Sequence, residues 1–75
     1  MEKEKKYLIQ LGERLRYFRK LKGYSNYEHL AYDLGISRSQ YGNYENGGNL
    51  KFSTLCRILD HFEISLKDFF ADGFE

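Results

Sequence analysis

The chain has one cysteine, no proline and no long apolar run. Its single thiol, on Cys56, has no internal partner for a disulfide, and its place beside Leu55 suits a small core residue. No apolar stretch approaches the about 20 residues that cross a bilayer, and the N-terminus does not resemble a secretory signal. We therefore expect a cytoplasmic protein with no membrane-spanning segment.

The sequence also has few residue patterns that are typical of metal-binding, phosphate-binding or catalytic sites. His29 and His61 are far apart, and with one cysteine they give neither Cys-x-x-Cys nor His-Glu-x-x-His spacing, so we expect no metal site. The glycine pair Gly47 and Gly48 follows no strand, as a phosphate-binding loop would require. A helical chain of 75 residues has little room for an enclosed pocket. We therefore expect no catalysis, no cofactor and no small-molecule ligand.

The composition indicates one folded domain over residues 1–75. Hydrophobic residues make up 41% of the chain and aromatic residues 17%, which argues against disorder. A chain of this size buries only about 60% of its unfolded surface. Its stability is therefore modest unless its packing is compact or it forms an oligomer.

The net charge is only +1, but the charges are unevenly distributed. Residues 1–24 carry eight Lys or Arg against three Glu, whereas residues 25–49 and 50–75 each have a net charge of −2. One basic end suits a surface that faces phosphate groups. A solvated helix with scattered ion pairs accounts for the same pattern.

Apolar spacing predicts an all-α chain of five helices. Leu8, Leu11, Leu15 and Phe18 share one face of a helix over about residues 4–22. Further helices are expected over about 26–34 and 37–46, from about 53 to 62, and around 66–70. No segment shows the sustained alternation of a half-buried strand.

Capping residues and glycines mark the ends of the second and third helices. Ser25 or Asn26 can cap the second helix, and Ser25 with Glu28 has capping-box spacing. Ser37 is the candidate cap of the third helix, in which Gly42 costs about 1 kcal/mol of helix propensity relative to alanine.

These two short helices and their tight turn predict a helix-turn-helix over about residues 26–46. Gly35 supplies the positive φ angle that the turn needs. Ala31 is small where the helices cross, and Ile36 and Tyr41 attach the turn to the core.

Three segments, "IQLGERLRYFRKLKGYS", "HLAYDLGISRSQYGNYENG" and "TLCRILDHFEISLKDFF", resemble the Cro/C1-type (XRE) helix-turn-helix family of phage repressors and bacterial regulators. The resemblance covers residues 9–71. It implies a five-helix phage-repressor-like domain that binds specific sequences of double-stranded DNA, usually as a dimer, to control transcription. We thus expect a small regulator, most simply a repressor or autoregulator. A restriction–modification controller or an antitoxin would use the same fold.

The resemblance also implies that the helix over about 37–46 enters the major groove. Arginine can pair with guanine, glutamine and asparagine can each pair with adenine, and serine is adaptable. The alternative to base reading is that the polar face of this helix is only solvated and contacts no DNA. The residues expected at the base edges are Arg38, Ser39, Gln40 and Asn43.

Further contacts are implied with the DNA backbone. Relatives carry a glutamine at the start of the second helix, but "SNYEHLA" is one residue longer, so either Asn26 or Tyr27 takes that position. Small or amide-bearing residues after the third helix would let main-chain N–H groups reach phosphate oxygens. The expected backbone contacts are Asn26, Tyr27, Ser37, Asn46, Gly47 and Arg19.

Two further features concern the stability of the domain and its association into a dimer. Arg19 and Glu45 match positions that form a semi-buried ion pair in phage repressors. The aromatic surface of Phe69, Phe70 and Phe74 is larger than one short terminal helix needs. Part of this surface can therefore form a two-fold dimer interface. The alternative to the dimer is a monomer in which these aromatic residues only cover the core. The alternative to a DNA-binding regulator is a protein-interaction module with weak or no specific DNA binding.

Overall fold

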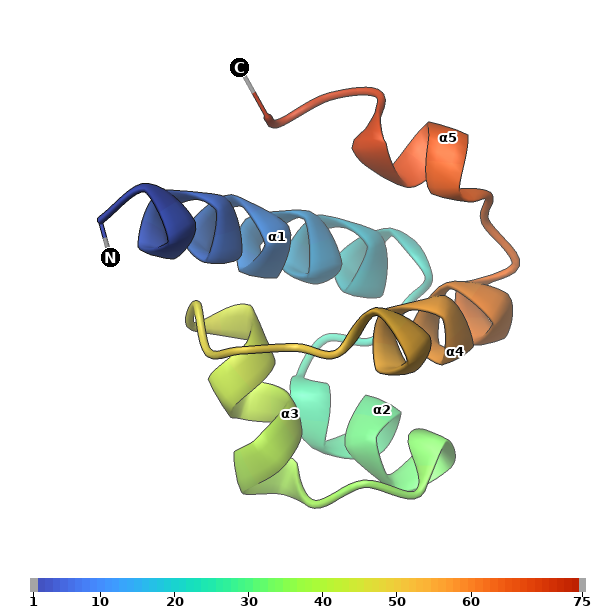
Figure 1. Ribbon diagram of the computed structural model, residues 1–75. Coiled ribbons are helices and arrows are strands. Elements are labelled where there is room, and N and C mark those ends of the chain that lie inside the picture. Colours follow the sequence, from blue (N-terminus) through green and yellow to red (C-terminus); the bar gives the residue numbers. More distant parts are fainter. Residues whose placement is uncertain (1, 75) are drawn as a thin grey trace.

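A computed structural model describes residues 2–74 and confirms the all-α prediction, since these residues form five helices and no strand (Figure 1). Met1 and Glu75 lie outside the described residues. Each helix begins and ends close to its predicted limits. The helices are α1 (Glu2–Leu21), α2 (Tyr27–Leu34), α3 (Arg38–Glu45), α4 (Phe52–Phe62) and α5 (Leu66–Phe70).

The long α1 runs between α5 on one side and the α2–α3 pair on the other (Figure 1). Arg14 joins α1 to α5, because its Nε donates to the carbonyl of Phe69 at 2.8 Å. Gly12 joins α1 to α3, since a Cβ atom on it would lie 2.5 Å from the carbonyl oxygen of Glu45. The end of α3 is therefore fixed against the middle of α1.

The cap of α2 is Asn26 and not Ser25. Asn26 Oδ1 accepts hydrogen bonds from the backbone N–H groups of Glu28 at 3.0 Å and His29 at 3.3 Å. The capping box expected from Ser25 and Glu28 is therefore wrong, because the helix begins one residue later than that pairing needs.

The turn between α2 and α3 follows the sequence prediction. Gly35 ends α2 with φ of 73°, and the Oγ of Ser37 accepts from the N–H of Gln40 at 3.1 Å. Ile36 is half-buried against the core. The angle between α2 and α3 is therefore held by the left-handed backbone of Gly35, the cap of Ser37 and the apolar contact of Ile36.

All five helices contribute to one apolar core. Leu15 and Phe18 of α1 are buried, as the periodicity predicted, and they meet the inner faces of the other helices. The largest fully buried side chains include Tyr41, Phe62 and Phe69. Truncating a buried aromatic side chain of this kind to alanine costs about 3–5 kcal/mol.

Gly42, in the middle of α3, makes room for the side chain of Tyr27. A Cβ atom at Gly42 would lie 3.0 Å from the ring of Tyr27, which packs beside Tyr41 with ring centroids 6.1 Å apart. The glycine thus lowers the helix propensity of α3 but allows α2 and α3 to approach closely.

Candidate nucleic-acid interface

The two faces of α3 differ in chemistry. Tyr41 and Tyr44 are buried on the inner face, with Tyr41 fully inaccessible, and their rings meet edge to face. This aromatic pair holds the helix against the core and turns the opposite side chains toward solvent. The exposed residues of α3 are Arg38, Ser39, Gln40 and Asn43, which are the four side chains predicted to read bases.

Arg38 lies at the start of α3 and pairs with Glu28 of α2. Its Nη1 is 3.1 Å from Glu28 Oε2, and both side chains are largely exposed. The hydrogen bond to Glu28, and then the negative charge of Glu28, raise the pKa of Arg38. Solvent screens such an exposed pair strongly, so Arg38 can exchange Glu28 for another acceptor at little cost.

Ser39 and Gln40 have polar contacts within α3 and its cap. Gln40 Nε2 donates to the Tyr44 hydroxyl at 2.7 Å, so its amide is held along the helix. The hydroxyls of Ser39 and Ser37 lie 3.4 Å apart, at the long end of the hydrogen-bond range. Gln40 is therefore the more fixed of the two side chains.

Asn43 lies over the turn that follows α3. A Cβ atom on Gly48 would sit only 2.1 Å from Asn43 Nδ2, and Gly48 donates its N–H to the Asn43 carbonyl at 2.7 Å. Gly48 therefore leaves the space that the Asn43 side chain fills. The sequence alone does not predict this role of Gly48, because the contact depends on how the chain folds back after α3.

Asn26 and Tyr27, the alternatives for the start of α2, differ in exposure. Asn26 is exposed, and its amide NH2 is not used by the cap, in which only Oδ1 takes part. Tyr27 is half-buried against Tyr41 and Gly42. Of the two residues, Asn26 is therefore the more exposed.

The main chain after α3 differs from the expectation. The N–H of Asn46 donates to the carbonyls of Gly42 at 3.1 Å and Asn43 at 3.2 Å, and that of Gly47 donates to Tyr44 at 3.3 Å. These N–H groups satisfy the last carbonyls of α3, as helix ends require, and are not available for phosphate. The side chain of Asn46 is exposed and remains a possible donor.

Arg19 and Glu45 are brought together inside the molecule. Arg19 Nε lies 2.7 Å and Nη2 3.2 Å from the two Glu45 oxygens, and Nη1 donates to the carbonyl of Tyr24 at 2.9 Å. Their side chains are only 6% and 2% exposed. Burial, with the negative charge of Glu45, also raises the pKa of the neighbouring Tyr41.

Arg16 is the exposed member of this charged cluster and was not singled out from the sequence. Its Nε is 3.5 Å from Glu45 Oε1, and its side chain is 44% exposed. Arg16 lies three residues before Arg19 on α1, so helical spacing places the two guanidinium groups near one carboxylate. That spacing could have identified Arg16 once the partner of Arg19 was known.

The three C-terminal phenylalanines do not share one surface. Phe69 is fully buried and stacks on Phe18, with ring centroids 5.8 Å apart, so it belongs to the core and is not part of the exposed aromatic surface. Phe70 is 43% exposed and Phe74 is half-buried. Both line an apolar groove of about 350 Å³ between α1, α4 and the C-terminal segment, which also includes Tyr7, Leu11 and Phe52.

Residues 2–74 show neither a metal-binding cluster nor a membrane-spanning helix. No group of three or more His, Cys, Asp or Glu residues in this part of the chain could hold a metal ion. None of its helices is both long and apolar enough to cross a membrane.

A family model described as helix-turn-helix, HTH_3, matches residues 15–69, from the middle of α1 to α5. No curated protein and no solved structure matches the chain. The matched segment includes the α2–α3 pair, the Arg19–Glu45 ion pair and the exposed face of α3. The chain therefore belongs to the Cro/C1-type helix-turn-helix family of DNA-binding regulators.

Proposed function

We propose that this protein binds a specific sequence of double-stranded DNA by inserting α3 into the major groove and thereby acts as a small repressor or autoregulator of transcription. One observation carries the proposal: α3 buries two tyrosines and turns four side chains that can pair with base edges toward solvent. Helix-turn-helix proteins place the second helix in the major groove in this way.

Each exposed side chain of α3 has a role in this proposal. Arg38 releases Glu28 and pairs with guanine or with a flanking phosphate. Gln40 and Asn43 each offer a donor and an acceptor to adenine, after Gln40 leaves the Tyr44 hydroxyl and Asn43 turns away from Gly48. Each good bidentate contact supplies about 1–3 kcal/mol of discrimination against the wrong base.

Phosphate contacts would border this helix on both sides. The exposed amide groups of Asn26 and Asn46 and the hydroxyl of Ser37 can donate to phosphate oxygens. We assign Arg19 to the scaffold, because its guanidinium is buried and shared between Glu45 and Tyr24. Arg16 replaces it as the cation that can reach the DNA backbone.

We further propose that two copies associate through the apolar groove that Phe70 and Phe74 line. Tyr7 and Phe52 on the same groove are 58% and 62% exposed, which leaves large aromatic surfaces in water. A two-fold arrangement would bury the same patch on both copies and present two α3 helices to one DNA duplex, about 34 Å apart.

A protein-interaction module on the same fold is the second candidate. It is favoured by the low charge of α3, whose only cation, Arg38, is paired with Glu28. Such a module would show weak or no preference for any DNA sequence.

Selection of a binding site from random duplex DNA separates the two candidates. We expect an enriched sequence, and we expect Gln40→Ala and Asn43→Ala to weaken binding to it while the helical circular dichroism stays unchanged. An unenriched pool, or variants that bind the selected site as tightly as the parent protein, would refute the proposed reading of bases by α3.

A further inference from the structure

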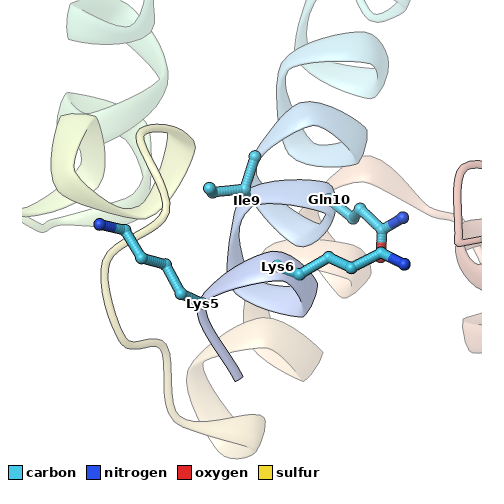
Figure 2. A pocket seen from close by; sticks show the side chains of 4 residues that line it. All are labelled: Lys5, Lys6, Ile9 and Gln10. Carbon is cyan, nitrogen blue, oxygen red and sulfur yellow. The ribbon is translucent and has the colours of Figure 1, made fainter. Parts of the chain in front are cut away.

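The first turns of α1 carry three lysines, with Glu4 between the first two, beside the end of α3. Lys3, Lys5 and Lys6 are exposed, and the family match begins only at residue 15, so these turns lie outside it. Lys5, Lys6, Ile9 and Gln10 border an open pocket of about 320 Å³ on this part of α1 (Figure 2).

Ile9 fixes the position of these turns relative to the DNA-facing surface. A Cβ atom on Gly47 would lie 3.0 Å from Ile9 Cγ1 and 3.6 Å from its Cα, so the turn after α3 packs directly on α1 at this residue. Lys5 precedes Ile9 by four residues and therefore shares its face of the helix, one turn further out.

The side chains of the two neighbouring lysines point in different directions. Figure 2 shows Lys5 and Ile9 on the side of α1 that faces the segment after α3, and Lys6 with Gln10 on the other side. Lys5 thus extends the surface that begins with Asn46 at the end of α3. Lys6 has the same charge but does not face that surface.

A phosphate contact beside the end of α3 is best made by a cationic side chain. The N–H groups of Asn46, Gly47 and Gly48 each donate to a carbonyl of α3, so these three main-chain groups are already used. When a helix lies in the major groove, the phosphates that border the groove pass its ends. A flexible ammonium group beside this turn can neutralise one of them as a point charge.

From this geometry we propose that Lys5 binds a backbone phosphate of the duplex next to the C-terminal end of α3. This contact rests on the proposed function, since it requires α3 to lie in the groove. It adds to the family-matched domain a sequence-independent contact made by the preceding turns of α1.

Fluorescence anisotropy with the intact chain tests the contact through its salt dependence. Each phosphate contact adds about 0.9 to the slope of log affinity against log salt concentration. Lys5→Gln should therefore lower that slope by about 0.9 and reduce the loss of affinity between about 50 and 200 mM salt by about 3.5-fold. The change should be equal on a selected site and on unrelated duplex DNA.

Lys6→Gln is the matched control, because it removes the same charge at the adjacent position of the same helix. We expect Lys6→Gln to leave the slope close to that of the parent protein, with both variants retaining the parent circular dichroism. If the parent binds with a steep slope and the two variants behave alike, the Lys5 contact is refuted and the proposed function stands. If the parent shows no salt-dependent binding to any duplex, the proposed function fails and the Lys5 contact fails with it.

Discussion

Replacing Glu45 with glutamine tests the ion pair that joins α1 to the end of α3. The substitution keeps the shape of the side chain but removes the charge that faces Arg19 at 2.7 and 3.2 Å. Arg19 would remain buried without a counter-charge, and its neutral acceptors would be the carbonyl of Tyr24 and the one amide oxygen of the new side chain. Breaking a buried pair on one side costs about 3–5 kcal/mol, because a charge is left unpaired in a poorly solvated site.

That loss is large for a chain of this size. At about 0.05–0.15 kcal/mol per residue, 75 residues give about 4–11 kcal/mol of unfolding free energy. Urea unfolding followed by circular dichroism should therefore show a midpoint much below that of the parent protein, or a chain that is unfolded without urea. A loss below about 1 kcal/mol would refute the account of the pair.

A double-mutant cycle separates the pair from the loss of packing. Arg19→Met combined with Glu45→Gln should be destabilised by less than the sum of the two single variants, because no charge is then left alone. Glu28→Gln is the control, since it breaks the exposed pair with Arg38 and should leave the unfolding midpoint almost unchanged.

Three further predictions follow from close contacts and from the groove. Gly12→Ala should lower the free energy of unfolding by about 1–3 kcal/mol in urea unfolding, because its Cβ atom would meet the Glu45 carbonyl; an unchanged midpoint would contradict this close crossing. Gly48→Ala should displace the side chain of Asn43 and alter its amide NMR signals, and unchanged Asn43 signals would exclude the contact. Phe70→Glu should shift sedimentation toward the monomer, and a parent protein that is monomeric at high concentration would refute the proposed dimer.

The order and limits of the helices could be predicted because their signals are local. Leu11, Leu15 and Phe18 repeat at helical spacing, and in the structure Leu15 and Phe18 are buried and Leu11 is half-buried against them. Gly35 and Ser37 likewise act through their own backbone and cap, independently of distant contacts. The family resemblance rested on such local features in sequence order, and the family match agrees with it.

Features that depend on the tertiary fold could not be derived in the same way. Gly12 reads as an unfavourable residue inside a helix, and only the approach of α3 shows why it is small. The capping-box spacing favoured Ser25, whereas the structure starts α2 at Tyr27, which packs on Tyr41, and so makes Asn26 the cap.

The remaining differences at the site have the same origin. The main-chain N–H groups of Asn46 and Gly47 were expected to face phosphate, but they already donate to carbonyls at the end of α3. Phe69 and Phe70 are adjacent in the sequence, and the rotation of α5 buries the first and exposes the second. In each case a correct element was predicted, and its orientation decided the role of the residue.

The central claim is that α3 reads a DNA sequence, and its most direct test is the affinity of the protein for a selected duplex relative to a scrambled duplex of equal length and composition. Measured by anisotropy at a fixed salt concentration, the selected site should bind at least about 1000-fold more tightly, as specific DNA-binding proteins do. Arg38→Ala should reduce that ratio, because it removes a side chain from the exposed face of α3. Equal affinity for the two duplexes would contradict the account.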